Sequence, residues 1–337
     1  MTTFCEYMDK ALYGPVGYYA SGAAKSGREG DYFTAPDVGA AFGQLLAEIF
    51  QGWEKKLGAK DFTIIEAGAG EGRLAQDILA SHTFRYIAVE RSPVRRSFLE
   101  RIRSAHPGRF VVSADLKPWK GLSGVLLANE LIDAFPVHRV QAKKGKLHEL
   151  FLEGPGERRR FVWKEPSTPA LEAYFQRLGI TLPDGYETEV NLAMAEWLRE
   201  AAGALEKGLV VLIDYGRPAH EYYLPERSRG TLRAFSKHKV SADFLDPAAT
   251  VDLTADVDFT SLALDAKEAG FVPLAFMEMG TFLMQGAAKL TSAPRGLKYL
   301  LHPEGMGSAF HVLILGKGLD PAEWVFEHNR LPRLGLS

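Results

Sequence analysis

The chain has 337 residues, of which 46% are hydrophobic and 24% charged, a balance typical of a soluble globular protein with a sizeable core. Its formal charge of −2 provides no basic footprint, which argues against a general nucleic-acid-binding protein. The single cysteine, Cys5, excludes an internal disulfide and a cysteine-based zinc cluster. The nine histidines show no metal-ligand spacing, so we expect no metal.

The amino-terminal residues resemble no targeting segment. They include Glu6 and Asp9 and lack an uninterrupted apolar stretch, unlike a secretory signal or an Arg-rich transit peptide. Nowhere does a run of about 18 apolar residues occur, so we expect no membrane insertion. These observations predict a soluble, cytoplasmic protein.

Short apolar runs rich in β-branched residues alternate with helical patterns along the chain. Such runs are typical of strands buried on both faces. We predict strands at 62–66, 86–90, 110–112, 124–128 and 209–214, and helices at 72–80, 93–104 and 188–206. The alternation predicts an α/β fold with a doubly wound, Rossmann-like sheet and helices on both faces. Two later runs, 271–279 and 309–316, are expected to complete the sheet, with one antiparallel strand.

Two segments do not follow this alternation. In 137–165 the apolar runs are separated by the turns "KKGK" and "GPGE", which predict antiparallel hairpins. The segment 217–255 is polar and irregular, and a loop this long is usually functional or mobile. We predict three parts: a segment that covers the cofactor site (1–60), the catalytic core (61–136 and 188–337) and an inserted subdomain for substrate or partner (137–187).

The stretch "EAGAGEGRL" from Glu66 places three glycines between a strand and a helix. A strand that ends in such a turn brings backbone N–H groups and the positive end of a helix to the edge where α/β folds bind ligands. The dinucleotide spacing G-x-G-x-x-G fails because its third position is Arg73, and a P-loop lysine is missing. The pattern instead resembles the first motif of class I S-adenosylmethionine methyltransferases, in which an acidic residue such as Glu66 binds the methionine amino end. A tight structural turn is the alternative for Gly68, Gly70 and Gly72.

Acidic and amide residues follow the next strands. Glu90 ends the second strand, where a carboxylate can accept hydrogen bonds from both ribose hydroxyls. Asp115 stands where methyltransferases of this class contact the adenine amino group, although it also fits a turn or a cap. Asn129 and Glu130 end the fourth strand, next to the expected position of the departing methyl group.

Several longer blocks together resemble the MidA-like methyltransferases. They extend from about residue 12 to 260 in family order: "LYGPVGYYA", "GREGDYFTAPDVGAAFGQLLAE", "EAGAGEGRLAQDIL", "ANELIDAFPVHRV", "LIDYG", "GTLRAFSKHKV" and "DLTADVDF". The resemblance implies a class I fold with insertions and S-adenosyl-L-methionine as cofactor. The family's mitochondrial member assists assembly of respiratory complex I, and for that member the resemblance implies symmetric dimethylation of an arginine in a complex I subunit. For eukaryotic relatives it implies a location in the mitochondrial matrix. The resemblance leaves open whether the chain forms a homodimer.

The resemblance also assigns residues to the site. Besides the glycine motif, it places cofactor-binding positions at Gly30, Tyr32 and Thr34, and a second block at Asn129, Glu130, Asp133, Ala134 and Pro136. The chain departs from the family pattern at Tyr32, Asp37 and Ala69, where Phe, Glu and Pro are usual. These changes remove no polar group that the cofactor needs.

The chemistry of the acceptor points to the carboxylates after the fourth strand. A guanidinium acceptor needs carboxylates that hold and orient it, and Glu130 and Asp133 are candidates. The alternatives are a helix cap for Asp133 and a solvated Glu130. His238 is a candidate base or gate, although a loop histidine is more often exposed and inert.

Some residues have a functional and a structural interpretation side by side. Tyr18, Tyr19 and Tyr32 either line the cofactor pocket or pack the amino-terminal segment. The charge run 157–160 is either a solvated hairpin rim or a contact for an acidic partner.

Three functions fit these patterns. The first is a protein arginine methyltransferase. The second is a methyltransferase with another acceptor, although "NELIDAFP" lacks the N-P-P-[YF] pattern after the fourth strand and disfavours nucleic acid. The third is an assembly factor that binds the cofactor and works chiefly by docking.

Overall fold

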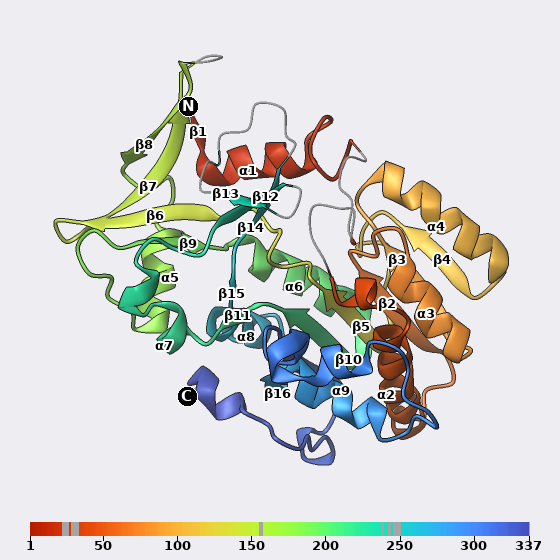
Figure 1. The fold of residues 1–337 in the computed structure, drawn as a ribbon. Helices are drawn as coiled ribbons and strands as arrows, with labels where there is room; N and C mark the ends of the chain where they lie inside the picture. Colours follow the sequence, from red (N-terminus) through yellow and green to blue (C-terminus); the bar gives the residue numbers. More distant parts are fainter. Residues whose placement is uncertain are drawn as a thin grey trace.

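A seven-stranded sheet forms the centre of the protein (Figure 1). The structure is a computed structural model that describes residues 1–21, 27, 34–154, 158–236, 239–241, 244 and 251–336. From one edge to the other, the strands are β16 (Val272–Glu278), β17 (His311–Lys317), β10 (Leu205–Asp214), β5 (Leu122–Asn129), β2 (Phe62–Ala67), β3 (Arg85–Val89) and β4 (Phe110–Ser113). All predicted strands of the central sheet are present, with shifted ends.

The strand directions confirm the predicted topology. Strands β4, β3, β2, β5 and β10 are parallel, whereas β17 is antiparallel to β10 and to β16. From β2 the chain builds outward through β3 and β4, and then returns to place β5 and β10 on the other side of β2. Ligands of open α/β sheets bind at such a reversal, outside the carboxyl ends of the strands.

Helices cover both faces of the sheet (Figure 1). One face carries α2 (Ala41–Leu57), α3 (Arg73–Ser81), α4 (Pro93–Ala105), α9 (Met279–Ala287) and α10 (Leu297–Leu301), and the other carries α6 (Ala193–Ala204) and α8 (Phe259–Glu268). Consecutive strand residues point to opposite faces, so Ile64 lies in one core and Ile65 in the other, both fully buried. This two-sided burial explains why the strands appear as continuous apolar runs.

The segment after β5 forms a second, antiparallel sheet. Its strands are β1 (Thr2–Thr3), β6 (His138–Lys143), β7 (Lys146–Glu153), β8 (Arg160–Lys164) and β9 (Glu187–Val190), and it packs against α1 (Phe4–Tyr13) and α5 (Ala170–Leu178). The β6–β7 hairpin turns at Lys144 and Gly145, which both have positive φ, as a two-residue hairpin turn requires. The hairpins predicted from "KKGK" and "GPGE" are thus present. The three-part domain division stays a prediction, and α2 of the first part packs onto the central sheet.

The predicted helix at 188–206 is wrong in its first part. Glu187–Val190 forms β9, which pairs with β6, and α6 begins at Ala193. The side chain of Asn191 accepts hydrogen bonds from Ala193 N (3.1 Å) and Met194 N (3.2 Å) and so starts the helix. A β-branched pair ahead of a capping residue was a signal of this boundary.

The segment 217–255 is more regular than predicted. It contains α7 (Ala219–Tyr222) and a three-stranded antiparallel sheet of β12 (Arg233–Ser236), β13 (Lys239–Ser241) and β14 (Asp252–Thr254). A short parallel pair of β11 (Gly216–Arg217) and β15 (Val257–Asp258) borders it. Single helical turns lie at Ala35–Val38, Pro225–Arg227, Pro303–Gly307, Pro321–Glu323 and Leu331–Leu334.

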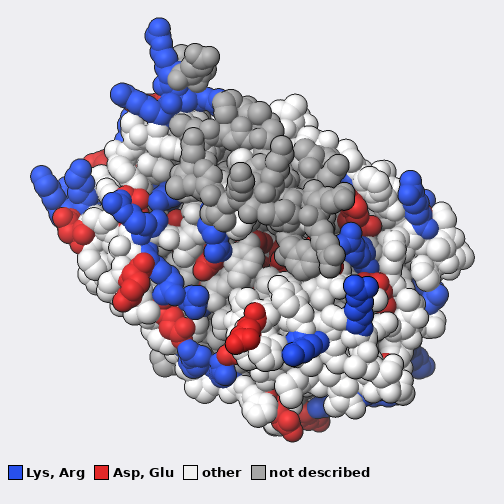
Figure 2. All heavy atoms as spheres, in the orientation of Figure 1, with Lys and Arg blue, Asp and Glu red and all other residues white. Residues whose placement is uncertain are grey.

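Basic side chains gather at the tips of the second sheet. Figure 2 shows them along the end of the β7–β8 hairpin, where Arg158 and Arg160 are exposed. Arg160 forms an ion pair with Glu153. This agrees with the solvated-rim interpretation of the charge run, of which Glu157 lies outside the described residues.

Candidate functional site

The carboxyl ends of the parallel strands open into one large cavity of about 1830 Å³. A single small-molecule site usually measures roughly 300–1,000 Å³, so this cavity has room for a cofactor and a second reactant. It lies at the reversal of strand order between β2 and β5. Its wall contains many of the predicted site residues: Thr34, Glu66, Gly68, Gly70, Glu90, Asp115, Asn129, Glu130 and Asp133.

The three glycines of the loop after β2 lack a side chain for different physical reasons. A Cβ on Gly68 would lie 2.9 Å from Leu131 Cδ1, and one on Gly72 would collide with Ile102 and Leu99 of α4. Those two glycines therefore permit close packing within the protein. Gly70 has a φ of +56°, and a Cβ there would meet nothing closer than a side-chain atom of Arg95 at 3.9 Å. Of the three, Gly70 is the one whose missing side chain leaves open space at the cavity wall.

Glu90 joins the glycine loop to the start of α4. One carboxylate oxygen accepts a hydrogen bond from Gly70 N (2.8 Å), and the other accepts one from Ser92 N (2.7 Å). Each carboxylate oxygen has a second lone pair, so the ribose role predicted for Glu90 is compatible with these bonds. Glu90 also holds the loop in place.

Replacing Glu90 with alanine is expected to weaken binding of S-adenosyl-L-methionine about ten- to a hundredfold, or about 1.5–3 kcal/mol. The change removes a charged acceptor and frees the N–H groups that it holds. Titration calorimetry measures the affinity, with Glu100→Ala on α4, outside the cavity, as the control. Parental affinity in Glu90→Ala would place the ribose contact elsewhere.

Glu66 is buried at the end of β2, where it accepts a hydrogen bond from the Tyr86 hydroxyl (2.7 Å). Burial raises the pKa of Glu66 to about 8, against the smaller lowering by Tyr86. A buried carboxyl with a raised pKa favours a cationic ligand group beside it. The amino end of a methionine moiety is such a group, so Glu66 fits its predicted role.

The short helical turn at Ala35–Val38 contacts both the start of α3 and the end of β5 at the cavity wall. The N–H and the hydroxyl of Thr34 both donate to Asp37 (2.9 and 2.8 Å), and Asp37 forms an ion pair with Arg73 at the start of α3. Ala35 N donates to Glu130 Oε1 (3.2 Å) at the end of β5. Thr34 thus shapes this turn at the cavity wall.

Other predicted residues have mixed placements. Asp115 lines the cavity, but it is exposed and accepts a hydrogen bond from Lys117 N (2.9 Å), as a turn residue does. Tyr19 lines the cavity and donates to Asp252 (2.6 Å), whereas Tyr18 is buried in the core beneath α1. Three predicted site residues lie outside the described part of the chain: Gly30, Tyr32 and His238.

Glu130 stands at the end of β5 with a strained backbone. Its φ is +49°, unusual for a residue other than glycine, and its N–H donates to Ile213 O (2.8 Å). Asn129 Nδ2 donates to Glu130 Oε1 (3.1 Å). Burial and the neighbouring Asp133 raise the pKa of Glu130 to about 8. Strain of this kind concentrates at functional sites.

Asp133 lies in the turn that follows β5, where no helix begins, so the helix-cap alternative for this residue is wrong. Its side chain is buried and accepts a hydrogen bond from the Tyr215 hydroxyl. Burial raises the pKa of Asp133 to about 6, although Tyr215 and Arg233 act in the opposite direction.

Asp214 does not line the cavity, but it supports the site, and the sequence reasoning missed it. It ends β10, is 1% exposed, and accepts hydrogen bonds from Ile132 N (3.0 Å), Asp133 N (3.2 Å) and Tyr215 N (2.9 Å). It therefore fixes the turn that carries Asp133. The signal was its position: like Glu66 and Glu90, it is an acidic residue at the end of a parallel strand.

Two acceptor atoms at the end of β5 have no partner. Asn129 Oδ1 and Asp133 Oδ1 are buried, and neither receives a hydrogen bond in the described part of the chain. Buried acceptors are normally paired, so a ligand with several N–H donors fits here.

Comparisons with known proteins identify the chemistry. Residues 42–277 match the family of S-adenosyl-L-methionine-dependent methyltransferases. The chain belongs to this family. It is similar to "Protein arginine methyltransferase NDUFAF7 homolog, mitochondrial" of Drosophila melanogaster (30% identity over 98% of this chain and 84% of that protein). It is also similar to the corresponding mouse protein (28% identity, 93% of this chain, 80% of that protein).

A solved structure agrees with the sequence comparisons. A Burkholderia thailandensis protein, crystallised with S-adenosyl-homocysteine, has a TM-score of 0.84 and 27% identity, and the match covers 94% of this chain and 88% of that one. The family and the fold predicted for this chain are thereby confirmed, and S-adenosyl-L-methionine is its cofactor. Three described features are compatible with binding of this cofactor: the buried carboxyl of Glu66, the open space at Gly70 and the carboxylate of Glu90 at the end of β3.

Three other expectations concern the location of the protein, a membrane span and a metal site. The names of these relatives place them in mitochondria, so they give the cytoplasmic prediction no support. Within the described ranges, no helix is both long and apolar enough to cross a membrane. In the same ranges, no three His, Cys, Asp or Glu side chains are grouped to hold a metal ion.

Proposed function

We propose that this methyltransferase modifies an arginine side chain of a protein substrate. The observation that carries the proposal is the acidic pocket, defined here as Glu130 and Asp133, which line the cavity after β5, together with Asp214 at the end of β10, which does not line the cavity and holds the Asp133 backbone. Burial raises the pKa of all three carboxyls, and the mutual repulsion of the three groups adds to the rise for Glu130 and Asp214. Such a pocket gains most from a cation, and a guanidinium keeps its charge at any physiological pH.

The geometry of a guanidinium suits the acceptors on offer. Its planar fork of N–H donors can satisfy several oxygens at once, and Asn129 Oδ1 and Asp133 Oδ1 are buried and unpaired. Glu130 Oε1 is oriented by Ala35 N and Asn129 Nδ2, so its carboxylate has a fixed direction toward the cavity that it lines. We infer that Glu130 and Asp133 hold the acceptor.

The protein contributes position and charge to the reaction. The bound cofactor supplies an electrophilic methyl group. Glu130 and Asp133 hold the guanidinium so that one nitrogen faces that methyl group, which is the alignment that accelerates a displacement. A carboxyl whose pKa lies near 8 is also a suitable acceptor for the proton that the methylated nitrogen releases.

The names of the relatives support a protein substrate, since they are called protein arginine methyltransferases. A subunit of respiratory complex I is our first candidate, on the family resemblance. A role as a docking factor alone is less well supported: among the described residues of 137–165, no large hydrophobic side chain is exposed.

Methylation of a cell lysate tests the proposal. The purified protein is incubated with labelled S-adenosyl-L-methionine and a lysate from cells that lack it, and labelled residues are located by mass spectrometry. We expect label on arginine of one or a few proteins. Label on small molecules alone, or on another side chain, would contradict the proposal.

A further inference from the structure

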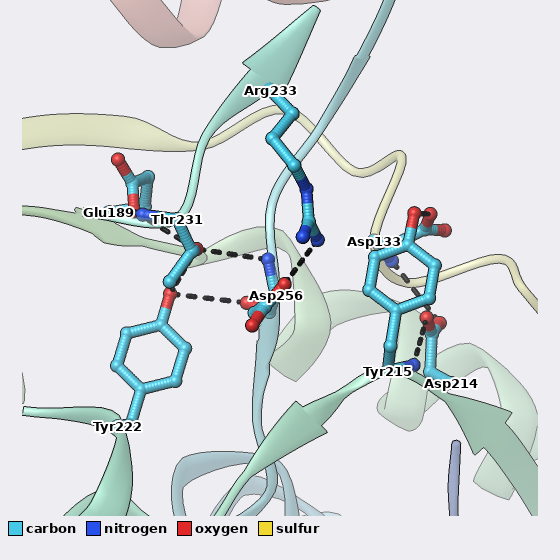
Figure 3. Close-up of polar contacts among 8 residues, drawn as sticks. All are labelled: Asp133, Glu189, Asp214, Tyr215, Tyr222, Thr231, Arg233 and Asp256. Carbon is cyan, nitrogen blue, oxygen red and sulfur yellow. Dashed lines mark hydrogen bonds and ion pairs between the residues drawn. The ribbon is translucent and has the colours of Figure 1, made fainter. Parts of the chain in front are cut away.

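The segment "GTLRAF" contains a basic residue, Arg233, that forms part of the cavity wall. Arg233, the first residue of β12, lines the cavity and forms an ion pair with Asp256. Its guanidinium carbon lies 5.1 Å from the ring centroid of Tyr215. Figure 3 shows the Arg233 side chain between Asp256 on one side and the Tyr215 ring on the other. The cation therefore stacks on the tyrosine and pairs with the carboxylate at the same time.

Tyr215 connects this cation to the acidic pocket. It follows Asp214 at the end of β10, and its hydroxyl donates to Asp133 (Figure 3). The backbone of Asp133 is itself held by Asp214. Asp214 therefore holds the main chain of Asp133, and Tyr215, the residue that follows β10, holds its side chain.

Asp256 is held firmly enough to fix Arg233. Its N–H donates to Thr231 Oγ1 (3.0 Å), and its carbonyl accepts from the Tyr222 hydroxyl (3.1 Å). Thr231 N in turn donates to the buried Glu189 of β9 (2.7 Å). Figure 3 shows these contacts as one continuous group. The position of Arg233 is therefore set by the second sheet and by α7.

The charges around Asp133 are mostly negative. Within the described ranges, the ionisable groups that face it come from α1, the ends of β5 and β10, β12 and the turn between β14 and β15: Tyr13, Glu130, Asp214, Tyr215, Arg233 and Asp256. In this set Arg233 is the cation, and it lowers the pKa of Asp133, whereas Asp256 raises it. Among the residues that the structure describes, loss of Arg233 would leave carboxyl and phenol groups around Asp133.

We propose that Arg233 is a positioning residue for methyl transfer, because it stacks on the ring of Tyr215, whose hydroxyl donates to Asp133, and so holds Asp133 in one orientation toward the acceptor. As a cation beside Asp133, it also favours the ionised carboxylate. This inference rests on the proposed function, in which Asp133 holds a cationic acceptor. Arg233 acts through Asp133 and Tyr215. The insertion 217–255 therefore supplies charge to a pocket built by the central sheet.

Direct measurement of the Asp133 carboxyl tests the inference without any turnover. Protein labelled with ¹³C-aspartate is titrated by NMR, and the Asp133 resonance is assigned by its loss in Asp133→Asn. In Arg233→Met we expect the pKa of Asp133 to rise by about one unit, since a neighbouring cation is lost. Arg233→Lys should keep most of the parental pKa. Arg233→Gln, which keeps polar contacts, is titrated in parallel in case Arg233→Met does not fold.

A matched control is available four residues earlier. Arg229 belongs to the same segment and pairs with Glu187, but its side chain is 85% exposed and does not line the cavity. Arg229→Met should leave the Asp133 titration unchanged. An unchanged Asp133 pKa in folded Arg233→Met or Arg233→Gln would overturn the inference, and so would an equal shift in Arg229→Met.

The pH profile of methyl transfer gives the second readout. Asp133 must be ionised to hold a cation, so activity falls as the pH drops through its pKa near 6, in addition to the fall that Glu130, with a pKa near 8, causes in the parent and the Arg233 variants alike. Relative to the parent at the same pH, a rise of about one unit in the Asp133 pKa would lower activity about fivefold at pH 6 and by less than about 1.2-fold at pH 8. We expect this pattern in Arg233→Met, partial recovery in Arg233→Lys and unchanged cofactor affinity. A uniform loss at all pH values would indicate a structural role. If the NMR shift occurs but the parent methylates no arginine, the proposed function fails and the electrostatic role of Arg233 stands.

Discussion

Replacing Glu130 with glutamine is expected to lower methyl transfer by about 10²–10³-fold, the usual cost of removing electrostatic stabilisation at a reacting centre. Glutamine keeps the shape of the side chain and can still accept from Ala35 N, but it cannot carry the charge that orients a guanidinium or accept its proton. Affinity for S-adenosyl-L-methionine should stay near parental. Single-turnover methylation of the protein substrate, measured beside cofactor binding by calorimetry, separates the two effects.

A structural glutamate would behave differently. An exposed glutamate changed to glutamine shifts the free energy of unfolding by no more than about 0.5 kcal/mol and leaves turnover unchanged. Glu100→Gln on α4 is such a control, since Glu100 lies outside the cavity and pairs with Arg103 within the helix. Full activity in Glu130→Gln would remove this residue from the arginine site and favour a different acceptor.

Replacing Gly70 with valine is expected to abolish measurable cofactor binding, a loss of about 3 kcal/mol or more, roughly a hundredfold in affinity. The Cβ of the new side chain would enter open space at the cavity wall, because it meets no protein atom closer than 3.9 Å. The backbone at φ +56° adds a strain of about 1–2 kcal/mol. The protein should therefore fold with a lowered melting temperature and fail to bind.

Gly58 provides a matched control for the backbone strain. It ends α2 with a φ of +61°, its Cβ would also meet nothing, and it does not line the cavity. Gly58→Val should lose as much stability as Gly70→Val and bind the cofactor like the parent. Calorimetry and thermal unfolding on both variants make the comparison. Normal binding by Gly70→Val would show that the glycine loop does not border the cofactor.

The central sheet could be predicted because its strands are buried on both faces. Ile64, Ile65 and their neighbours form an uninterrupted apolar run in which either face meets a core, so hydrophobicity alone reveals the strand. The same reasoning located Glu66, Glu90 and Glu130, since each follows such a run directly. It failed at β9, where a polar strand runs into a helix after only two residues.

The rest of the site depends on contacts between distant parts of the chain. Tyr215 meets Asp133, and Arg233 meets Tyr215, only because β10 lies beside β5 and the second insertion folds over both. Local periodicity contains no information about such pairs. The glycines show a related limit. The sequence pattern does not distinguish Gly68, Gly70 and Gly72, whereas in the structure Gly68 packs against Leu131 and Gly72 packs against α4.

The pairing of β1 with β7 has a consequence for how the cavity is completed during synthesis. Thr2 and Thr3 pair with Leu152 and Phe151, which the ribosome adds much later, and α1, which supplies Tyr13 to the cavity wall, follows β1 directly. Contacts between such distant residues form slowly because the intervening chain must first be ordered. The part of the cavity wall made by α1 therefore cannot close until β7 has been synthesised and the second sheet has formed.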